Sequence, residues 1–343
     1  MPGHQPIIVR IAQVGAGYWG RNLLRNFSAI PQAEVVWVCD TQEEAQKDAA
    51  ANHPGIRTTG DIQDILADES VEGVIVATET PQHFLMAEAA LRAGKHVFVE
   101  KPLAQTVDQA ERLVALAEEN DLRLMVGHLL LYHPAFRHVE ELIGQNELGD
   151  IRYLYSTRVN LGIVRQRENA FESLAPHDLS IALAYIDSKP VAVAAQGSAY
   201  LQPNIEDVVF ATVFFENGAL AHVHTSWLDP HKIRKTTVVG SKLMAVIDDM
   251  EPSEKVRLYD KGAEVAEPSG YTGFAEAVSV RSGSIVIPKI ENEEPLRSEC
   301  EEFVASIVEQ RRPHTDGRSG LAVVRLLEAA RQSLEAGGAR VDV

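Results

Sequence analysis

Three glycines and an aspartate have the types and spacing of a site that binds a dinucleotide. Gly15, Gly17 and Gly20 directly follow a short apolar run, and Asp40 ends the next one. In this motif the first glycine makes a tight turn, the second lets a pyrophosphate approach, and the third lets helix and strand pack closely. An acid in this position accepts hydrogen bonds from ribose hydroxyls and repels a 2′-phosphate, which favours NAD over NADP. The alternative is a glycine turn in another α/β protein, but the flanking strand, helix and acid favour the dinucleotide.

Further loops after apolar runs are expected to reach the same ligand. The run at 71–77 leads into a loop containing Thr78, Pro81 and His83. In open α/β sheets, ligands lie at the carboxyl ends of the strands, where such loops are found. The predicted cofactor-binding residues are Gly15, Gly17, Tyr18, Trp19, Gly20, Asp40, Thr78, Pro81, His83, Glu100 and Lys101.

Lys101 is the leading candidate for acid–base chemistry. It comes just after the apolar run at 96–99, at the edge where a nicotinamide should lie. An ordinary lysine keeps its proton at neutral pH, but partial burial and a nearby positive charge would lower its pKa enough to accept a hydroxyl proton. The alternative is a surface lysine paired with Glu100, and position alone leaves both interpretations open.

His177 is the second catalytic candidate. Pro176 suits the first position of a helix, so His177 is expected in the first helical turn. The helix dipole there would lower the pKa of the imidazole and favour its neutral form. A neutral His177 could bond a substrate hydroxyl or relay its proton. The alternative is a polar residue at a helix start that is hydrogen-bonded to the backbone.

Other polar residues complete the predicted substrate site. Arg165 could hold a substrate phosphate, because a guanidinium matches phosphate geometry, or it could be an exposed arginine. The predicted substrate-contacting residues are Lys101, His128, Arg165, Asn169 and His177. His222 and His224 share one strand face, but no acid or cysteine lies at ligand spacing, so we expect a sheet-face role and no metal.

The order of the elements predicts two domains. Strands alternate with helices in the first half, which indicates a doubly wound parallel sheet of the Rossmann type in residues 1–149. Hairpin signals at Asn217-Gly218 and Gly240-Ser241 predict a large, mostly antiparallel sheet in an α+β domain, residues 150–343. Two amphipathic helices close the chain, and the last could pack back on the first domain.

Composition excludes several classes of protein. The net charge of −17 and the lack of a long basic run argue against a nucleic-acid partner. No apolar segment approaches membrane-spanning length and the start lacks a signal-peptide pattern, so a cytoplasmic location without a membrane partner is expected. The two cysteines, Cys39 and Cys300, form no C-x-x-C pair, which predicts neither a disulfide framework nor a zinc ribbon.

These motifs together resemble the glucose–fructose oxidoreductase/inositol dehydrogenase (Gfo/Idh/MocA) family. The resemblance covers nearly the whole chain and rests on Gly15 to Gly20, Glu100-Lys101-Pro102, His177-Asp178, the later sheet and Thr315-Asp316-Gly317. It implies that Lys101 is a catalytic acid/base and that His177 assists it. It also implies that the large sheet packs against a neighbouring subunit, giving homodimers or homotetramers.

A closer resemblance is to the nucleotide-sugar branch of the family, in particular to UDP-N-acetylglucosamine 3-dehydrogenases. It rests on the stretches 17–23, 155–158, 174–181 and 226–232. It implies oxidation of the 3-hydroxyl of a UDP-N-acetyl sugar to a ketone, with a hydride passed to NAD. The alternatives are a dehydrogenase of a free sugar, an inositol or a UDP-uronic acid, and an NAD-binding regulator of the same fold.

One position departs from the family pattern. Many members carry an acid four residues before the histidine, where this chain has Ser173. Glu172 beside it could substitute for that acid, or His177 could act without an acidic partner.

Overall fold

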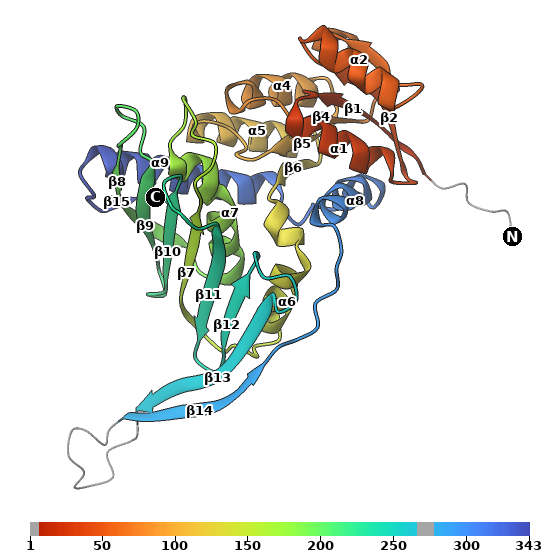
Figure 1. The fold of residues 1–343 in the computed structure, drawn as a ribbon. Coiled ribbons are helices and arrows are strands. Elements are labelled where there is room, and N and C mark those ends of the chain that lie inside the picture. The colour runs from red at the N-terminus through yellow and green to blue at the C-terminus, as the bar shows by residue number, and fades with distance from the viewer. Residues whose placement is uncertain (1–6, 266–277) are drawn as a thin grey trace, which may run out of the picture. The chain divides into compact units, whose positions relative to one another are not determined.

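The computed structural model describes residues 7–265 and 278–343, which divide into two compact units. The first unit comprises Met1–Tyr132 and Glu293–Glu328, and the second comprises His133–Asn292 and Ala329–Val343. This division differs from the expected serial domains, 1–149 and 150–343. The helix after residue 133 packs against elements of the second unit, and the chain later returns to the first unit to place a helix beside α1 (Figure 1).

A six-stranded parallel sheet forms the centre of the first unit. Its strand order is β3-β2-β1-β4-β5-β6, and each neighbouring pair is parallel. The central strands are buried apolar runs, as expected for a sheet covered on both faces. The predicted doubly wound Rossmann sheet is therefore confirmed. The strands are β1 (Val9–Val14), β2 (Ala33–Cys39), β3 (Arg57–Thr59), β4 (Gly73–Val76), β5 (His96–Glu100) and β6 (Leu124–Gly127).

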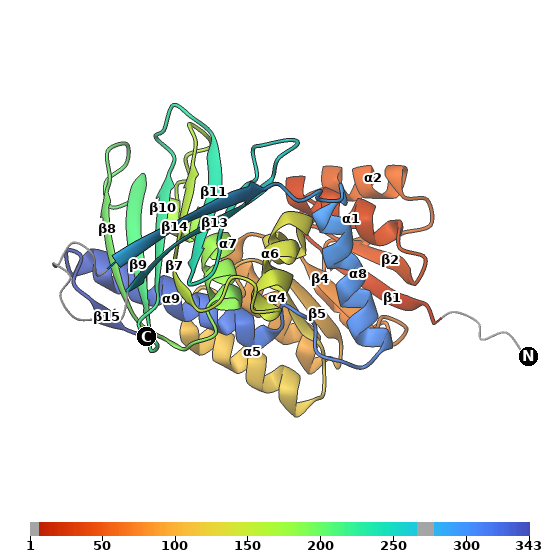
Figure 2. The ribbon, with the colours of Figure 1, turned by 90° about the horizontal axis from the view of Figure 1, so that it is seen from below.

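Helices cover both faces of this sheet. Helices α4 and α5 belong to one apolar cluster, which also contains Val324 of α9, and helices α1 and α8 belong to the other. Figures 1 and 2 show α8 lying beside α1. The second cluster contains Phe27, Phe98 and Phe303, whose rings meet edge to face with centroids 5.9–6.2 Å apart. The helical elements are α1 (Tyr18–Ser28), α2 (Glu43–Asn52), α3 (Ile62–Leu66), α4 (Thr80–Arg92), α5 (Val107–Glu119), η1 (Leu129–Tyr132), α8 (Pro295–Val308) and α9 (Gly317–Glu335), which ends in the second unit.

The second unit contains a nine-stranded sheet with helix α7 on one face. The strand order is β14-β13-β12-β11-β7-β10-β9-β8-β15, and only the β7–β10 pair among the described strands is parallel. Hairpins turn at Asn217-Gly218 and at Gly240-Ser241, which confirms the predicted, mostly antiparallel sheet. The elements are α6 (Pro134–Gly144), β7 (Ile151–Val159), α7 (Ala170–Tyr185), β8 (Pro190–Ser198), β9 (Val208–Phe215), β10 (Leu220–Ser226), β11 (Ile233–Gly240), β12 (Met244–Asp248), β13 (Val256–Val265), β14 (Val278–Val286) and β15 (Val341–Asp342).

The two faces of this sheet differ in burial. Alternate residues of β7, β9 and β10 are buried, and α7 packs against these three strands. The opposite face presents exposed side chains, including Tyr153, Tyr155, Phe210 and Leu220. On this face the ring of Phe210 stacks on His224 at 4.3 Å, and His222 Nδ1 lies 3.0 Å from the Thr212 hydroxyl. Within the described residues, no helix is both long and apolar enough to cross a membrane.

Candidate active site

The predicted cofactor residues meet at one edge of the parallel sheet. The glycine turn follows β1, Asp40 follows β2, Thr78 follows β4, Lys101 follows β5 and His128 follows β6. Since all these strands are parallel, their carboxyl ends lie at the same edge. The first unit thus brings these residues together, whereas His177, Arg165 and Asn169 belong to the second unit.

The glycine turn has the backbone that a pyrophosphate requires. Gly15 has φ +95°, and a Cβ there would lie 2.5 Å from the Ala77 carbonyl oxygen. A Cβ on Gly20 would collide with the Gly15 carbonyl oxygen, so the third glycine allows the close approach of α1 to the turn. At Gly17, apart from its own backbone and its neighbours along the chain, no atom of the described residues lies within 4 Å of the position of a Cβ. The space before Gly17 and the first amides of α1 therefore fit an anionic ligand.

Asp40 links this turn to β2 and keeps acceptor capacity. Its Oδ2 accepts a 2.7 Å hydrogen bond from the Ala16 amide, and its Oδ1 accepts one of 2.8 Å from the Gln42 amide. Each carboxylate oxygen has a further lone pair, and the residue is half-buried, so it can also accept from ribose hydroxyls. The donor and acceptor set at this edge therefore fits NAD.

Trp19 and Glu100 form a direct link between the start of α1 and the loop after β5. The Trp19 indole N–H donates to a Glu100 carboxylate oxygen, and the Lys101 amide donates to the other at 3.2 Å. Glu100 is only 9% exposed, and its carboxylate is engaged within the protein. Trp19 and Glu100 are both predicted cofactor ligands. In the structure the Glu100 carboxylate instead bonds to Trp19 and to the Lys101 amide. No spacing in the sequence signals this pairing.

The loop before α4 contains a residue whose predicted role needs correction. His83 was predicted to contact the cofactor, but it is 1% exposed and its two ring nitrogens face the backbone carbonyls of Thr78 and Pro102. Among the described residues, the buried Thr78 hydroxyl has no hydrogen-bond partner. Pro81 lies in the first turn of α4, and Tyr18 is 81% exposed beside the glycine turn.

His128 lies in the interior behind Lys101. It is fully buried, and neither ring nitrogen has a hydrogen-bond partner among the described residues. Burial, followed by the positive charge of Lys101, lowers the pKa of His128 to about 3, so its ring is neutral at physiological pH. This burial argues against the predicted direct contact of His128 with substrate. Lys101 itself is half-buried at the end of β5.

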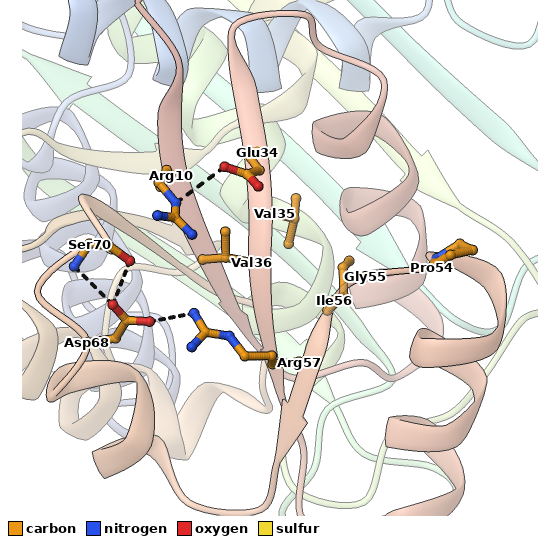
Figure 3. Close-up of a pocket in the computed structure, with 10 residues that line it drawn as sticks. All are labelled: Arg10, Glu34, Val35, Val36, Pro54, Gly55, Ile56, Arg57, Asp68 and Ser70. Atoms are coloured by element: carbon orange, nitrogen blue, oxygen red, sulfur yellow. Dashed lines mark hydrogen bonds and ion pairs between the residues drawn. The ribbon is translucent and has the colours of Figure 1, made fainter.

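A separate hollow lies near the amino ends of β1 and β2 and is unlike a cofactor site. Its volume is about 500 Å³. Its charged side chains are paired with one another, Arg10 with Glu34 and Arg57 with Asp68, as Figure 3 shows. The hollow is at the opposite strand ends from the glycine turn, so it is separate from the candidate cofactor site at the carboxyl edge. The hollow is lined by Arg10, Glu34, Val35, Val36, Pro54, Gly55, Ile56, Arg57, Asp68 and Ser70.

His177 lies in the middle of α7, which corrects the predicted position in a first helical turn. The helix begins at Ala170, and Pro176 lies inside it. The start is set by a capping box in which the Asn169 side chain accepts from the Glu172 amide at 2.9 Å and Glu172 accepts from the Asn169 amide at 3.1 Å. The argument that a helix N-terminus lowers the pKa of His177 is therefore wrong.

The capping box also changes the expected roles of Asn169 and Glu172. The Asn169 amide group donates to Glu206 at 2.9 Å as well, so both ends of its side chain are engaged within the unit. This corrects its assignment as a substrate ligand. The Glu172 carboxylate is engaged in capping the helix, so it does not substitute for the acid that the family pattern has at the position of Ser173. Arg165 is 54% exposed and lies 3.5 Å from Glu168.

A buried ion pair fixes α7 to the sheet next to His177. Asp178 accepts from Arg158 Nε at 2.7 Å and from a terminal Arg158 nitrogen at 3.2 Å, and the Ser156 hydroxyl also donates to it. Asp178 is 1% exposed and Arg158 7%. Sequence reasoning missed this pair, although Ser156 and Arg158 occupy alternate positions of one strand, which places them on the same face.

Comparisons with known proteins agree with this architecture. Residues 9–128 match the family model described as the oxidoreductase family with an NAD-binding Rossmann fold, and residues 136–246 match the GFO/IDH/MocA C-terminal domain. A UDP-N-acetylglucosamine 3-dehydrogenase of Acidithiobacillus ferrooxidans is 28% identical over 331 residues, covering 96% of this chain and 98% of that protein. The scyllo-inositol 2-dehydrogenase (NAD(+)) of Bacillus subtilis is 26% identical over 284 residues, covering 78% of this chain and 82% of that protein.

A solved structure shows the same fold over almost the whole chain. The structure of UDP-N-acetylglucosamine 3-dehydrogenase GnnA from Acidithiobacillus ferrooxidans superimposes with a TM-score of 0.83 at 25% identity. The match covers 97% of this chain and 100% of that one. The resemblance predicted from the motifs is thus confirmed, and the chain belongs to the Gfo/Idh/MocA family of oxidoreductases, with an NAD-binding Rossmann domain in its first unit.

Proposed function

We propose that this chain is an NAD-dependent dehydrogenase that oxidises the 3-hydroxyl of a UDP-N-acetyl sugar, UDP-N-acetylglucosamine, to the 3-keto sugar. The observation that carries the proposal is the position of Lys101 at the end of β5, on the same sheet edge as the glycine turn and Asp40. The nearly full-length similarity to a UDP-N-acetylglucosamine 3-dehydrogenase supports the choice of substrate.

The chain's own residues hold the cofactor and move the proton. The turn from Gly15 to Gly20 and the amides at the start of α1 bind the pyrophosphate, and Asp40 accepts from the ribose hydroxyls. Lys101 accepts the proton of the substrate hydroxyl as the carbonyl forms. These residues would hold NAD, which would supply the redox chemistry as the acceptor of a hydride from the same carbon.

Residues of the second unit serve the substrate in this proposal. His177 hydrogen-bonds the sugar and assists the proton transfer, held in place by the anchored Asp178 that follows it in α7. Ser173 lies one turn earlier on the same helix face, where many relatives have an acid. Arg165 is exposed and provides a guanidinium for a substrate phosphate.

We also propose that the second unit forms a homo-oligomer, a dimer or tetramer, through the open face of its large sheet. The support is the row of exposed apolar and aromatic side chains there, Tyr153, Tyr155, Phe210 and Leu220. Faces of this kind are commonly covered by another chain.

A turnover assay with NAD tests the function. The substrates are UDP-N-acetylglucosamine, UDP-glucose, a UDP-uronic acid, free N-acetylglucosamine and myo-inositol, each with wild type and Lys101→Ala. We expect activity with the UDP-N-acetyl sugar only, lost in the variant. Activity confined to the free sugar or to inositol would contradict a nucleotide-sugar substrate. It would favour a free sugar or a polyol such as inositol, and the similarity to an inositol dehydrogenase supports the latter. Binding of NAD without turnover of any substrate would favour a regulator.

A further inference from the structure

His83 is a buried imidazole that connects the two loops flanking the predicted nicotinamide position. Its Nδ1 lies 2.8 Å from the carbonyl oxygen of Pro102, and its Nε2 lies 3.1 Å from the carbonyl oxygen of Thr78. Pro102 follows Lys101 directly, and Thr78 belongs to the loop between β4 and α4. One side chain on α4 therefore spans the loop after β4 and the loop that carries Lys101.

The two contacts differ in what they require of the ring. A carbonyl oxygen only accepts hydrogen bonds, and a neutral imidazole has a proton on one nitrogen. Burial, and then the positive charge of Lys101, lower the pKa of His83, which favours the neutral ring at neutral pH. The shorter contact assigns the single proton to Nδ1, so the stronger hydrogen bond is donated to the Pro102 carbonyl, on the Lys101 side.

We propose that His83 is a positioning residue for Lys101: its Nδ1–H donates to the Pro102 carbonyl and holds the Lys101–Pro102 loop, while the ring lies against the Thr78 loop. This inference rests on the proposed function only in taking Lys101 as the acid/base. In this proposal His83 does not contact the cofactor but holds the loop from the protein interior, which agrees with its 1% exposure. A loop displaced by a fraction of an ångström would misplace the Lys101 amine relative to the substrate hydroxyl.

Three substitutions separate the two ends of the ring. In His83→Asn, the amide nitrogen takes the place of Nδ1 and keeps a donor toward Pro102. In His83→Gln, it takes the place of Nε2 and keeps a group toward Thr78. His83→Leu keeps the volume and removes both contacts. His96→Leu is the matched control. His96 begins β5, the strand that ends just before Lys101, and its Nδ1 accepts from the Arg123 amide at this distant end.

The expected pattern distinguishes positioning from a general effect on folding. His83→Asn should keep kcat within about threefold, while His83→Gln and His83→Leu should lose about tenfold or more in kcat, the size of one buried hydrogen bond, with the substrate KM little changed. His96→Leu should leave kcat unchanged even where it lowers the melting temperature. Equal kcat in the Asn and Gln variants, or wild-type kcat in both, would overturn the proposal.

A spectroscopic measurement tests the hydrogen bond of His83 without an activity assay. In long-range ¹H–¹⁵N NMR spectra of the full chain near pH 7.5, His83 should carry its proton on Nδ1, and Lys101→Met should raise the pKa of His83 by removing the neighbouring charge. A proton on Nε2, or an unchanged pKa, would contradict the proposed arrangement. Should all five compounds fail as substrates, the proposed function fails, while this result still decides whether His83 donates to the Pro102 carbonyl.

Discussion

Lys101 is the residue on which the proposed proton transfer depends. Replacing it by methionine keeps the length of the side chain but removes the amine, so kcat/KM should fall by about 10²–10⁴-fold with the accepted substrate. The affinity for NAD, measured by calorimetry, should stay within a few-fold, because the glycine turn and Asp40 are untouched. The exposed Lys47→Met is the control for loss of a lysine. Retained activity in Lys101→Met would exclude this residue as the acid/base.

Two buried carboxyl groups, those of Glu100 and Glu299, make stability depend on pH. Glu299 of α8 is fully buried, and neither of its oxygens has a hydrogen-bond partner among the described residues. Burial and the charge of Glu100 raise the pKa of Glu299 well above its usual 4.5, and burial raises the pKa of Glu100 to about 7. Both groups hold protons more tightly in the folded chain, so the free energy of unfolding falls as the pH rises from 4.5 through about 7.

Glu299→Gln tests this electrostatic cost. Glutamine has the same shape and does not ionise. The variant should therefore match wild type in its free energy of unfolding near pH 4.5, the ordinary glutamate value, and be more stable than wild type near pH 8. Chemical denaturation at the two pH values measures the difference. The control Glu119→Gln, at an exposed residue, should have little effect on the free energy of unfolding at either pH. A variant less stable than wild type at pH 8 would show that Glu299 is ionised and stabilised there.

Single residues divide into those that local sequence can place and those that it cannot. Asp40 and Lys101 were placed correctly at the carboxyl edge because each directly follows a recognisable buried strand. Glu100 ends β5 and His83 lies on α4 after the β4 loop, near the same sheet edge, yet their side chains contact Trp19 and the Pro102 carbonyl inside the protein. Tertiary contacts decide this, and no spacing within one segment encodes them.

At the scale of elements, the glycine turn separates ligand binding from folding. Gly17 has φ −65°, and a Cβ there meets no described atom, so Gly17→Ala should fold with wild-type stability yet bind NAD roughly tenfold or more weakly, because the methyl group occupies the approach of the pyrophosphate. Gly20→Ala should instead lose about 1–3 kcal/mol of stability, since its Cβ would collide with the Gly15 carbonyl oxygen.

Melting curves with and without NAD measure both effects together. The melting temperatures of wild type and Gly20→Ala should both rise when NAD is added, because the ligand binds only the folded state. Gly17→Ala should gain little at the same concentration. A Gly17→Ala variant with a full NAD shift would mean that the pyrophosphate lies elsewhere.

Helix α7 shows why element boundaries were harder to predict than element types. Its sequence contains Pro176, which is favoured at a first position, and this pointed to a start too late in the chain. The stronger signal was Asn169 followed three residues later by Glu172, which forms the observed capping box. A proline inside a helix is tolerated here because α7 packs against three strands and Asp178 anchors it to Arg158.

At the scale of the whole molecule, both sheets were predictable while the division of the chain was not. Periodicity and turn chemistry indicate parallel strands in the first half and hairpins in the second, as observed. The interleaving arises because α8 and the first part of α9 pack with the first unit, where Phe303 meets Phe98 and Arg325 pairs with Glu111 at 2.7 Å. The expectation that the last helix packs back on the first domain concerns α9, whereas no local pattern signals that α8 also returns there.

The proposed oligomer depends on the open face of the large sheet. Phe210, on β9, is 46% exposed on this face, so Phe210→Arg places a charge in the proposed apolar interface and should convert the oligomer to monomers without unfolding the chain. Light scattering coupled to size exclusion measures the mass. Leu85→Arg, at a 53% exposed apolar residue of α4, is the matched control and should keep the wild-type mass. A monomeric wild type, or dissociation of the Leu85→Arg variant alone, would contradict an interface through this sheet. The reason is that a new charge weakens assembly only where it lies inside the contact area.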